Sequence, residues 1–146
     1  MKNLLKLILL SVITIAFSSC SKNEETVIEP TPTIVGKWEF SKQVTYDNSN
    51  QEVITDYTHR CPSQKDFIQF ESNGVYNSTA SSSNCISETE TRTYVYENKV
   101  VKLYNGSDLI SYSIQVLSLS ANELKIKYVN SAVQKSGFDT YILVRK

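Results

Sequence analysis

The stretch from Lys37 to Tyr46, KWEFSKQVTY, decides the fold class because polar and apolar side chains alternate along it. Its apolar positions are Trp38, Phe40, Val44 and Tyr46. The residues between them are polar, which is typical of an antiparallel strand with one buried face. Lys42 is the exception on the apolar face, and an unpaired buried ammonium group is costly.

The same period of two continues to the end of the chain. The further alternating runs are Gln51 to Thr58, Asp66 to Glu71, Val75 to Ser81, Ser87 to Glu97, Val100 to Tyr104, Asp108 to Ser120, Glu123 to Asn130 and Phe138 to Arg145. Short turns rich in Asn and Gly separate many of them, and no stretch after residue 33 keeps a helical period. A sheet of eight or nine strands must close or split into two layers to hide its edges. We therefore predict an all-β, antiparallel up-and-down barrel, with a two-layer sandwich as the alternative.

The length and charge of the chain exclude several classes of protein. The chain has 146 residues, which suit one domain. Its 15 Lys and Arg residues balance 15 Asp and Glu residues, so the positive field of a nucleic-acid-binding protein is absent. Neither property names a partner.

The N-terminus has the pattern of an export signal. Basic residues precede an apolar stretch of 11 residues, Leu7 to Phe17, which is too short to span a membrane. The stretch ends on Phe17-Ser18-Ser19-Cys20, which resembles the lipobox of bacterial lipoproteins. We predict that residues 1–19 are removed and that Cys20 is acylated, which would anchor the protein in the membrane. The alternative is an ordinary signal sequence in which Cys20 is incidental.

Residues 20–33 are polar, contain two Pro residues and have no apolar period, which predicts a flexible tether. Ser21 follows the cysteine, as in lipoproteins sorted to the outer membrane. The cluster Lys22-Asn23-Glu24-Glu25 resembles an acidic tag for export to the cell surface, although these charges also suit a solvated linker. We expect a Gram-negative outer-membrane location, at the periplasmic face or at the cell surface.

The remaining cysteines, Cys61 and Cys85, belong to an exported domain, in which disulfides form and persist. We predict that they bond to each other. A zinc site or a redox switch is disfavoured because neither has a second cysteine nearby, and one histidine, His59, does not complete a metal site.

Catalytic groups are scarce in this sequence. His59 is the only histidine, so any nucleophile activated by histidine would depend on it. Glu88 and Glu90 share one strand face beside Arg92, an arrangement that suits a solvated surface better than a glycosidase pair. We predict no enzyme activity, no cofactor and no metal.

Two segments indicate a family. The segment Ile34 to Phe40, IVGKWEF, is similar to the Gly-x-Trp opening strand of lipocalins. The run Cys61 to Gly74, followed by Cys85, resembles the midsection of the lipocalin-like domain of small bacterial lipoproteins. The resemblance covers residues 34–146 and implies an eight-stranded calycin barrel without catalytic residues. It also implies that Trp38 packs at the closed end of the barrel against Arg145.

An eight-stranded barrel holds either a solid core or one small ligand. Tyr46, Tyr112 and Tyr128 occupy apolar-face positions and would line a ligand site, in which Lys42 would bind an anionic head. In the alternative, the tyrosines complete a solid core and Lys42 reaches water at the barrel mouth.

Two functions therefore stay open. The first is an anchored protein that binds a small, partly hydrophobic ligand. The second is a non-catalytic interaction module that contacts an envelope protein or a glycan, and an exposed patch of Tyr94 and Tyr96 would favour it.

Overall fold

The structure is a computed structural model that describes residues 31–129 and 139–146. The predicted signal sequence, Cys20 and the tether up to residue 30 lie outside the described residues, as do the predicted strand ends at Asn130 and Phe138. No helix among the described residues is long and apolar enough to cross a membrane.

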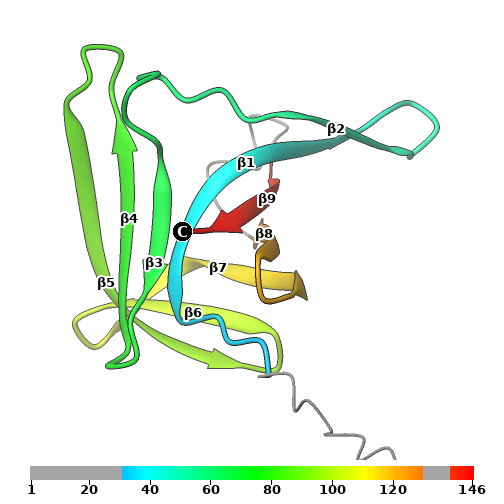
Figure 1. The fold of residues 1–146 in the computed structure, drawn as a ribbon. Coiled ribbons are helices and arrows are strands. Elements are labelled where there is room, and N and C mark those ends of the chain that lie inside the picture. Colours follow the sequence, from blue (N-terminus) through cyan, green and yellow to red (C-terminus); the bar gives the residue numbers. More distant parts are fainter. Residues whose placement is uncertain (1–30, 130–138) are drawn as a thin grey trace, which may run out of the picture. The chain divides into compact units, whose positions relative to one another are not determined.

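Nine strands follow one another within the described residues (Figure 1). They are β1 (Gly36–Tyr46), β2 (Glu52–Asp56), β3 (Phe67–Phe70), β4 (Val75–Ser81), β5 (Ser87–Glu97), β6 (Val100–Asn105), β7 (Asp108–Leu119), β8 (Glu123–Val129) and β9 (Thr140–Arg145). Each corresponds to one alternating run of the sequence, with ends that agree to within a few residues.

The strands form one closed antiparallel barrel. From β3 to β9 each strand pairs with its neighbour in the chain, and β1 pairs with both β3 and β9. Eight strands, β1 and β3 to β9, thus complete the ring, and β2 pairs with β1 alone. The predicted up-and-down eight-stranded barrel is confirmed, and the two-layer alternative is wrong.

Strand β1 pairs with β3 and β2 along one edge and with β9 along the other, where it changes register at a β-bulge. Its first residues, from Gly36, pair with β3, and its last residues, from Lys42, pair with β2. Against β9, Phe40 lies opposite Leu143 but Lys42 lies opposite Ile142, so one extra residue is inserted between them. After a bulge of this kind the side chains change faces.

The bulge corrects the predicted face of the opening strand. Trp38 and Phe40 point into the barrel, whereas Lys42 and Val44 point away from it. The Nζ atom of Lys42 lies 3.0 Å from a carboxylate oxygen of Asp56, its neighbour on β2. Lys42 is therefore a paired surface residue and not a buried cation.

Apolar side chains from all eight ring strands fill the barrel. Its fully buried members are Trp38, Ile68, Phe70, Tyr76, Val101, Leu103, Ile114, Val116, Leu124, Ile126 and Leu143. Burial of apolar surface of this extent is the main force that closes the sheet.

One end of the barrel, the base, is closed around Trp38. The guanidinium carbon of Arg145 lies 4.2 Å from the centre of the Trp38 ring, which is a cation–π contact. The indole nitrogen of Trp38 donates a hydrogen bond of 2.7 Å to the Ile34 carbonyl. The structure thus brings Trp38 and Arg145 together as the resemblance implies.

Arg145 also binds the segment that directly precedes β1. Its guanidinium donates hydrogen bonds to the carbonyls of Thr33 and Val35, at 2.7 and 2.9 Å. Gly36 has a φ of +141°, and a Cβ atom at this position would lie 2.4 Å from Arg145 Nη1. Only glycine fits this close approach at this backbone angle.

Candidate functional site: the aromatic end of the barrel

Tyrosine side chains gather at the end of the barrel opposite the base. Tyr128 and Tyr141 point inward near the ends of β8 and β9 that lie away from Arg145. The full group, called the aromatic end below, consists of Phe40, Tyr57, Tyr76, Tyr112, Tyr128 and Tyr141.

The rings of the aromatic end form a continuous series. Phe40 stacks on Tyr57 with ring centres 5.0 Å apart, and Tyr141 meets Phe40 edge-on at 5.3 Å. Tyr128 follows at 5.9 Å from Tyr141, and Tyr112 at 6.1 Å from Tyr128. These separations are those of favourable aromatic pairs.

The phenol hydroxyls remain neutral donors in this surrounding. The hydroxyls of Tyr76 and Tyr128 lie close enough for each to influence the pKa of the other. Burial raises the pKa of both groups above the ordinary value. The pKa of Tyr112 is also raised by burial, and the nearby charge of Glu90 raises it further.

A charged pair lies beside these phenols on the inner face of β5. Arg92 is opposite Tyr76 in the sheet, and Tyr94 is opposite the buried Leu103, so this face of β5 points into the barrel. The Nη2 atom of Arg92 is hydrogen-bonded to Glu90 Oε1. Their side chains are 21% and 47% exposed, so the pair stands where the interior meets water.

Arg92 has one unused donor. Its Nη1 atom donates to the Thr91 carbonyl at 3.2 Å. Its Nε atom is buried and has no hydrogen-bond partner in the part of the chain that the structure describes. A buried donor without a partner costs about 1–3 kcal/mol, so an acceptor that reached it would be favoured.

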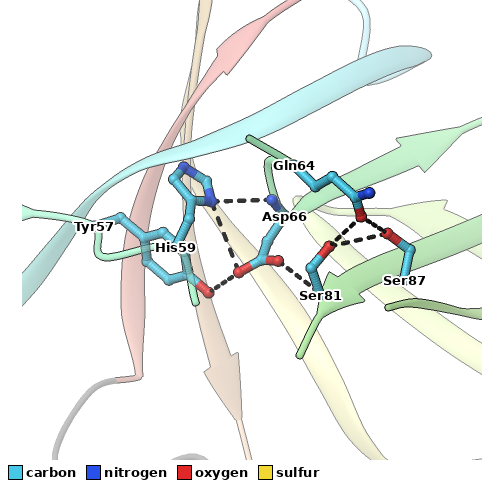
Figure 2. Close-up of polar contacts among 6 residues, drawn as sticks. All are labelled: Tyr57, His59, Gln64, Asp66, Ser81 and Ser87. Atoms are coloured by element: carbon cyan, nitrogen blue, oxygen red, sulfur yellow. Dashed lines mark hydrogen bonds and ion pairs between the residues drawn. The ribbon is translucent and has the colours of Figure 1, made fainter. Parts of the chain in front are cut away.

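The segment 57–66, called the cap segment below, lies against the aromatic end through Tyr57. Figure 2 shows how Asp66 holds it: Tyr57 donates its hydroxyl hydrogen to Asp66 Oδ2 at 2.9 Å, and the Ser81 backbone nitrogen donates to Oδ1 at 2.8 Å. The Asp66 backbone nitrogen donates to His59 Nδ1 at 2.9 Å. Only 8% of the His59 side chain and 5% of the Asp66 side chain is exposed. This network ties the cap segment to β4.

A second set of contacts fixes the other side of the cap segment. The Gln64 Oε1 atom accepts hydrogen bonds from the hydroxyls of Ser81 and Ser87, at 3.3 and 2.5 Å (Figure 2). A disulfide joins Cys61 to Cys85, whose Cα atoms are 5.1 Å apart. The cap segment is thus bonded to the hairpin of β4 and β5 both covalently and through hydrogen bonds.

The network around His59 does not have the contacts of a catalytic triad. In a triad the nucleophile contacts the histidine, and the carboxylate orients that histidine. Here His59 Nδ1 accepts from a backbone nitrogen, and the Ser81 hydroxyl binds Gln64 and Ser87 instead. Among residues 31–129 and 139–146, no group of three potential metal ligands lies together. The contacts suit a structural role for His59.

The structure places the predicted ligand-site residues in two regions. Tyr112 and Tyr128 lie in the aromatic end. Tyr46 is 48% exposed at the far end of β1, where its hydroxyl donates to Glu52 at 3.3 Å. Lys42 points away from the barrel as described above, so neither it nor Tyr46 joins the other two.

Sequence reasoning missed several residues of this region: Tyr57, Tyr76, Tyr141, Glu90 and Arg92. The sequence did contain one indication that Glu90 and Arg92 face the interior. Arg92 has the same parity as Tyr94 and Tyr96, which belong to the inner face of β5. The predicted solvated face of Glu88 and Glu90 is therefore the inner face of that strand, exposed only toward its beginning.

Comparison with known proteins agrees with this architecture. The family model described as a lipocalin-like domain matches residues 34–126. The chain belongs to the lipocalin-like domain family. Lipocalin-like domains are generally binding proteins without enzyme activity.

A solved structure is also similar to this chain. It is a lipocalin-like protein from Bacteroides uniformis ATCC 8492, with 16% sequence identity and a TM-score of 0.47. The match covers 77% of this chain and 96% of the other. No curated protein matches the chain.

Proposed function

We propose that this lipocalin-like protein binds a small, partly hydrophobic molecule at the aromatic end of its barrel. The observation that carries the proposal is the convergence of phenol hydroxyls and the Glu90–Arg92 pair within an otherwise apolar interior. Ligand sites in proteins combine mostly apolar walls with a few placed polar groups in this way.

We also propose that the protein is a lipoprotein of the Gram-negative outer membrane. The support is the lipobox-like sequence that ends on Cys20 and the polar tether that follows it. Two or three acyl chains on one cysteine are sufficient for stable anchoring, whereas one chain is not.

The alternative function, an interaction module, has less support. Its expected signature was an exposed patch of Tyr94 and Tyr96. Both side chains instead pack against the barrel core, and Tyr94 donates its hydroxyl hydrogen to the Glu71 carbonyl at 2.9 Å. We therefore favour ligand binding.

Native mass spectrometry of the domain, purified from its own host, tests the binding proposal. We expect a stoichiometric small molecule that is released on denaturation. Tyr128→Phe should lower its occupancy, and Tyr46→Phe, outside the aromatic end, should not. An empty wild-type spectrum, together with no thermal shift on addition of lipids or hydrophobic metabolites, would contradict the proposal.

Labelling with radioactive palmitate tests the anchor. We expect the wild-type protein to incorporate the label and Cys20→Ala to lose it. Equal labelling of both proteins would show that Cys20 is not the acylated residue.

A further inference from the structure

The Glu90–Arg92 pair stands at a break in the wall of the barrel. Pairing between β5 and β6 begins at Thr93, so residues 87–92 of β5 pair with β4 alone. The inner face of this unpaired stretch carries Glu90 and Arg92, next to Tyr112. Both charged side chains are partly exposed there, so they lie between the aromatic end and water.

The two charges act on the same phenol with opposite signs. Glu90 raises the pKa of Tyr112 and Arg92 lowers it, in addition to the larger effect of burial. Because Arg92 Nη2 is hydrogen-bonded to Glu90 Oε1, the two opposite charges lie together and offset each other for a group placed beside them. An anionic group there would lose to Glu90 much of the attraction that it gains from Arg92.

The hydrogen-bonding groups of the pair are nevertheless available. The Glu90 carboxylate is a half-exposed acceptor, and Arg92 Nε is a donor without a partner among the described residues that a ligand reaches once the partly exposed Arg92 side chain turns. A hydroxyl or amide group both donates and accepts, so it can use both members of the pair at once.

From this arrangement we infer that the ligand is an uncharged amphiphile whose head carries a hydroxyl or amide group, held between Glu90 and Arg92 with its apolar part on the tyrosine rings. The inference rests on the proposed function and names the ligand class of the same site. It replaces the anionic ligand that the sequence suggested through Lys42, because that lysine points away from the barrel.

A matched pair of probes tests the ligand class. Decanoate and 1-decanoylglycerol have the same acyl chain and differ in the charge of the head. Binding of each to the domain is measured by isothermal titration calorimetry at about pH 8, below the concentration at which either probe aggregates. We expect the wild type to bind the glyceride about tenfold more tightly than decanoate, because only decanoate meets the repulsion of Glu90.

Two variants change the charge balance in opposite directions. Glu90→Gln leaves Arg92 uncompensated, and we expect decanoate to bind about tenfold more tightly than to the wild type. Arg92→Gln leaves Glu90 uncompensated and should abolish decanoate binding while weakening the glyceride. Glu88→Gln is the control, since it removes a charge from the same face of β5 farther from Tyr112 and should preserve the wild-type ratio. Circular dichroism confirms that each variant is folded.

The results separate this inference from the proposed function. Equal binding of both probes to the wild type, or an unchanged ratio in Glu90→Gln, would overturn the ligand class but leave ligand binding intact. Failure of the wild type to bind either probe, together with an empty native mass spectrum, would overturn both.

Discussion

At the scale of single residues, the packing at the base of the barrel requires a glycine, Gly36, beside Arg145. Gly36 adopts a φ of +141° directly beneath the guanidinium of Arg145. That guanidinium in turn covers Trp38, the only tryptophan in the chain. The fluorescence of this one residue therefore reports on the base.

Gly36→Ala should destabilise the protein by about 2–3 kcal/mol, because its methyl group would strain the backbone and displace Arg145. Urea unfolding followed by Trp38 fluorescence measures the loss. Gly106→Ala is the control, since Gly106 also has a positive φ, +64°, but a Cβ atom there meets nothing within 4 Å. It should cost about 1 kcal/mol. Equal losses would mean that contact with Arg145 is unimportant.

Asp66→Asn should destabilise the protein by about 2–3 kcal/mol. The buried carboxylate accepts hydrogen bonds from Tyr57 and from the Ser81 backbone, and an amide retains only one acceptor oxygen. Asp56→Asn is the matched control, because it breaks only the exposed pair with Lys42 and should cost less than about 1 kcal/mol. Chemical denaturation of both variants gives the comparison, and a smaller loss for Asp66→Asn than for Asp56→Asn would contradict the role of this network.

At the scale of elements, the positions of the strands could be predicted from the sequence, whereas the β-bulge in β1 could not. Alternation in the runs Val75 to Ser81 and Ser87 to Glu97 was regular enough to predict β4 and β5 with their exact ends. The bulge in β1 adds one residue within an unbroken strand, and Val44 is buried on the outer face, so apolar residues continue at the expected positions. Only the register against β9 shows that the faces have changed.

The disulfide is the main prediction at this scale. The double variant Cys61→Ser, Cys85→Ser should lose about 3 kcal/mol of unfolding free energy, because the bond closes a loop with a sequence separation of 24 residues. Guanidinium unfolding with and without a reductant measures the loss. The reductant should destabilise the wild type and leave the double variant unchanged. Two reactive thiols in the denatured, unreduced wild type would refute the bond.

At the scale of the whole molecule, the ligand region was predictable only in part. Tyr112 and Tyr128 followed from alternation in β7 and β8 because each lies two positions from a buried residue of the same face, Ile114 and Ile126. Tyr57 lies in the alternating run Gln51 to Thr58 but follows the end of β2 at Asp56, and its ring reaches Phe40 only after the barrel has closed. Glu90 and Arg92 look solvated in sequence because they are charged. The inner face of β5 can hold them because β5 extends past its neighbour β6, which leaves these side chains partly exposed.

The buried phenols predict sensitivity to alkali. Burial raises the pKa of Tyr76 and Tyr128 in the folded protein above the ordinary value of 10.0. Their contribution to stability is therefore fully present below pH 10 and is lost as the pH rises, since the unfolded chain ionises first. We expect the urea midpoint to fall progressively as the pH rises above about 10.

Tyr128→Phe identifies the groups responsible. It should make this fall shallower, because one buried phenol no longer ionises on unfolding, whereas Tyr46→Phe at an exposed position should leave the slope unchanged. A midpoint that stays constant up to pH 11 would contradict this explanation.

The contacts of Arg145 have a mechanical consequence. Its guanidinium holds the carbonyls of Thr33 and Val35 and also donates to the Ala121 carbonyl at 2.6 Å, so three distant parts of the chain meet at one side chain. Tension applied to the N-terminal segment would act first on the hydrogen bonds at Thr33 and Val35 and only then on the pairing of β1, while the bond to Ala121 would hold Arg145 in place. The contacts of Arg145 at the base would therefore resist a force on the N-terminal segment. If the protein is anchored through that segment, a pull on the anchor would not readily expose the interior of the barrel.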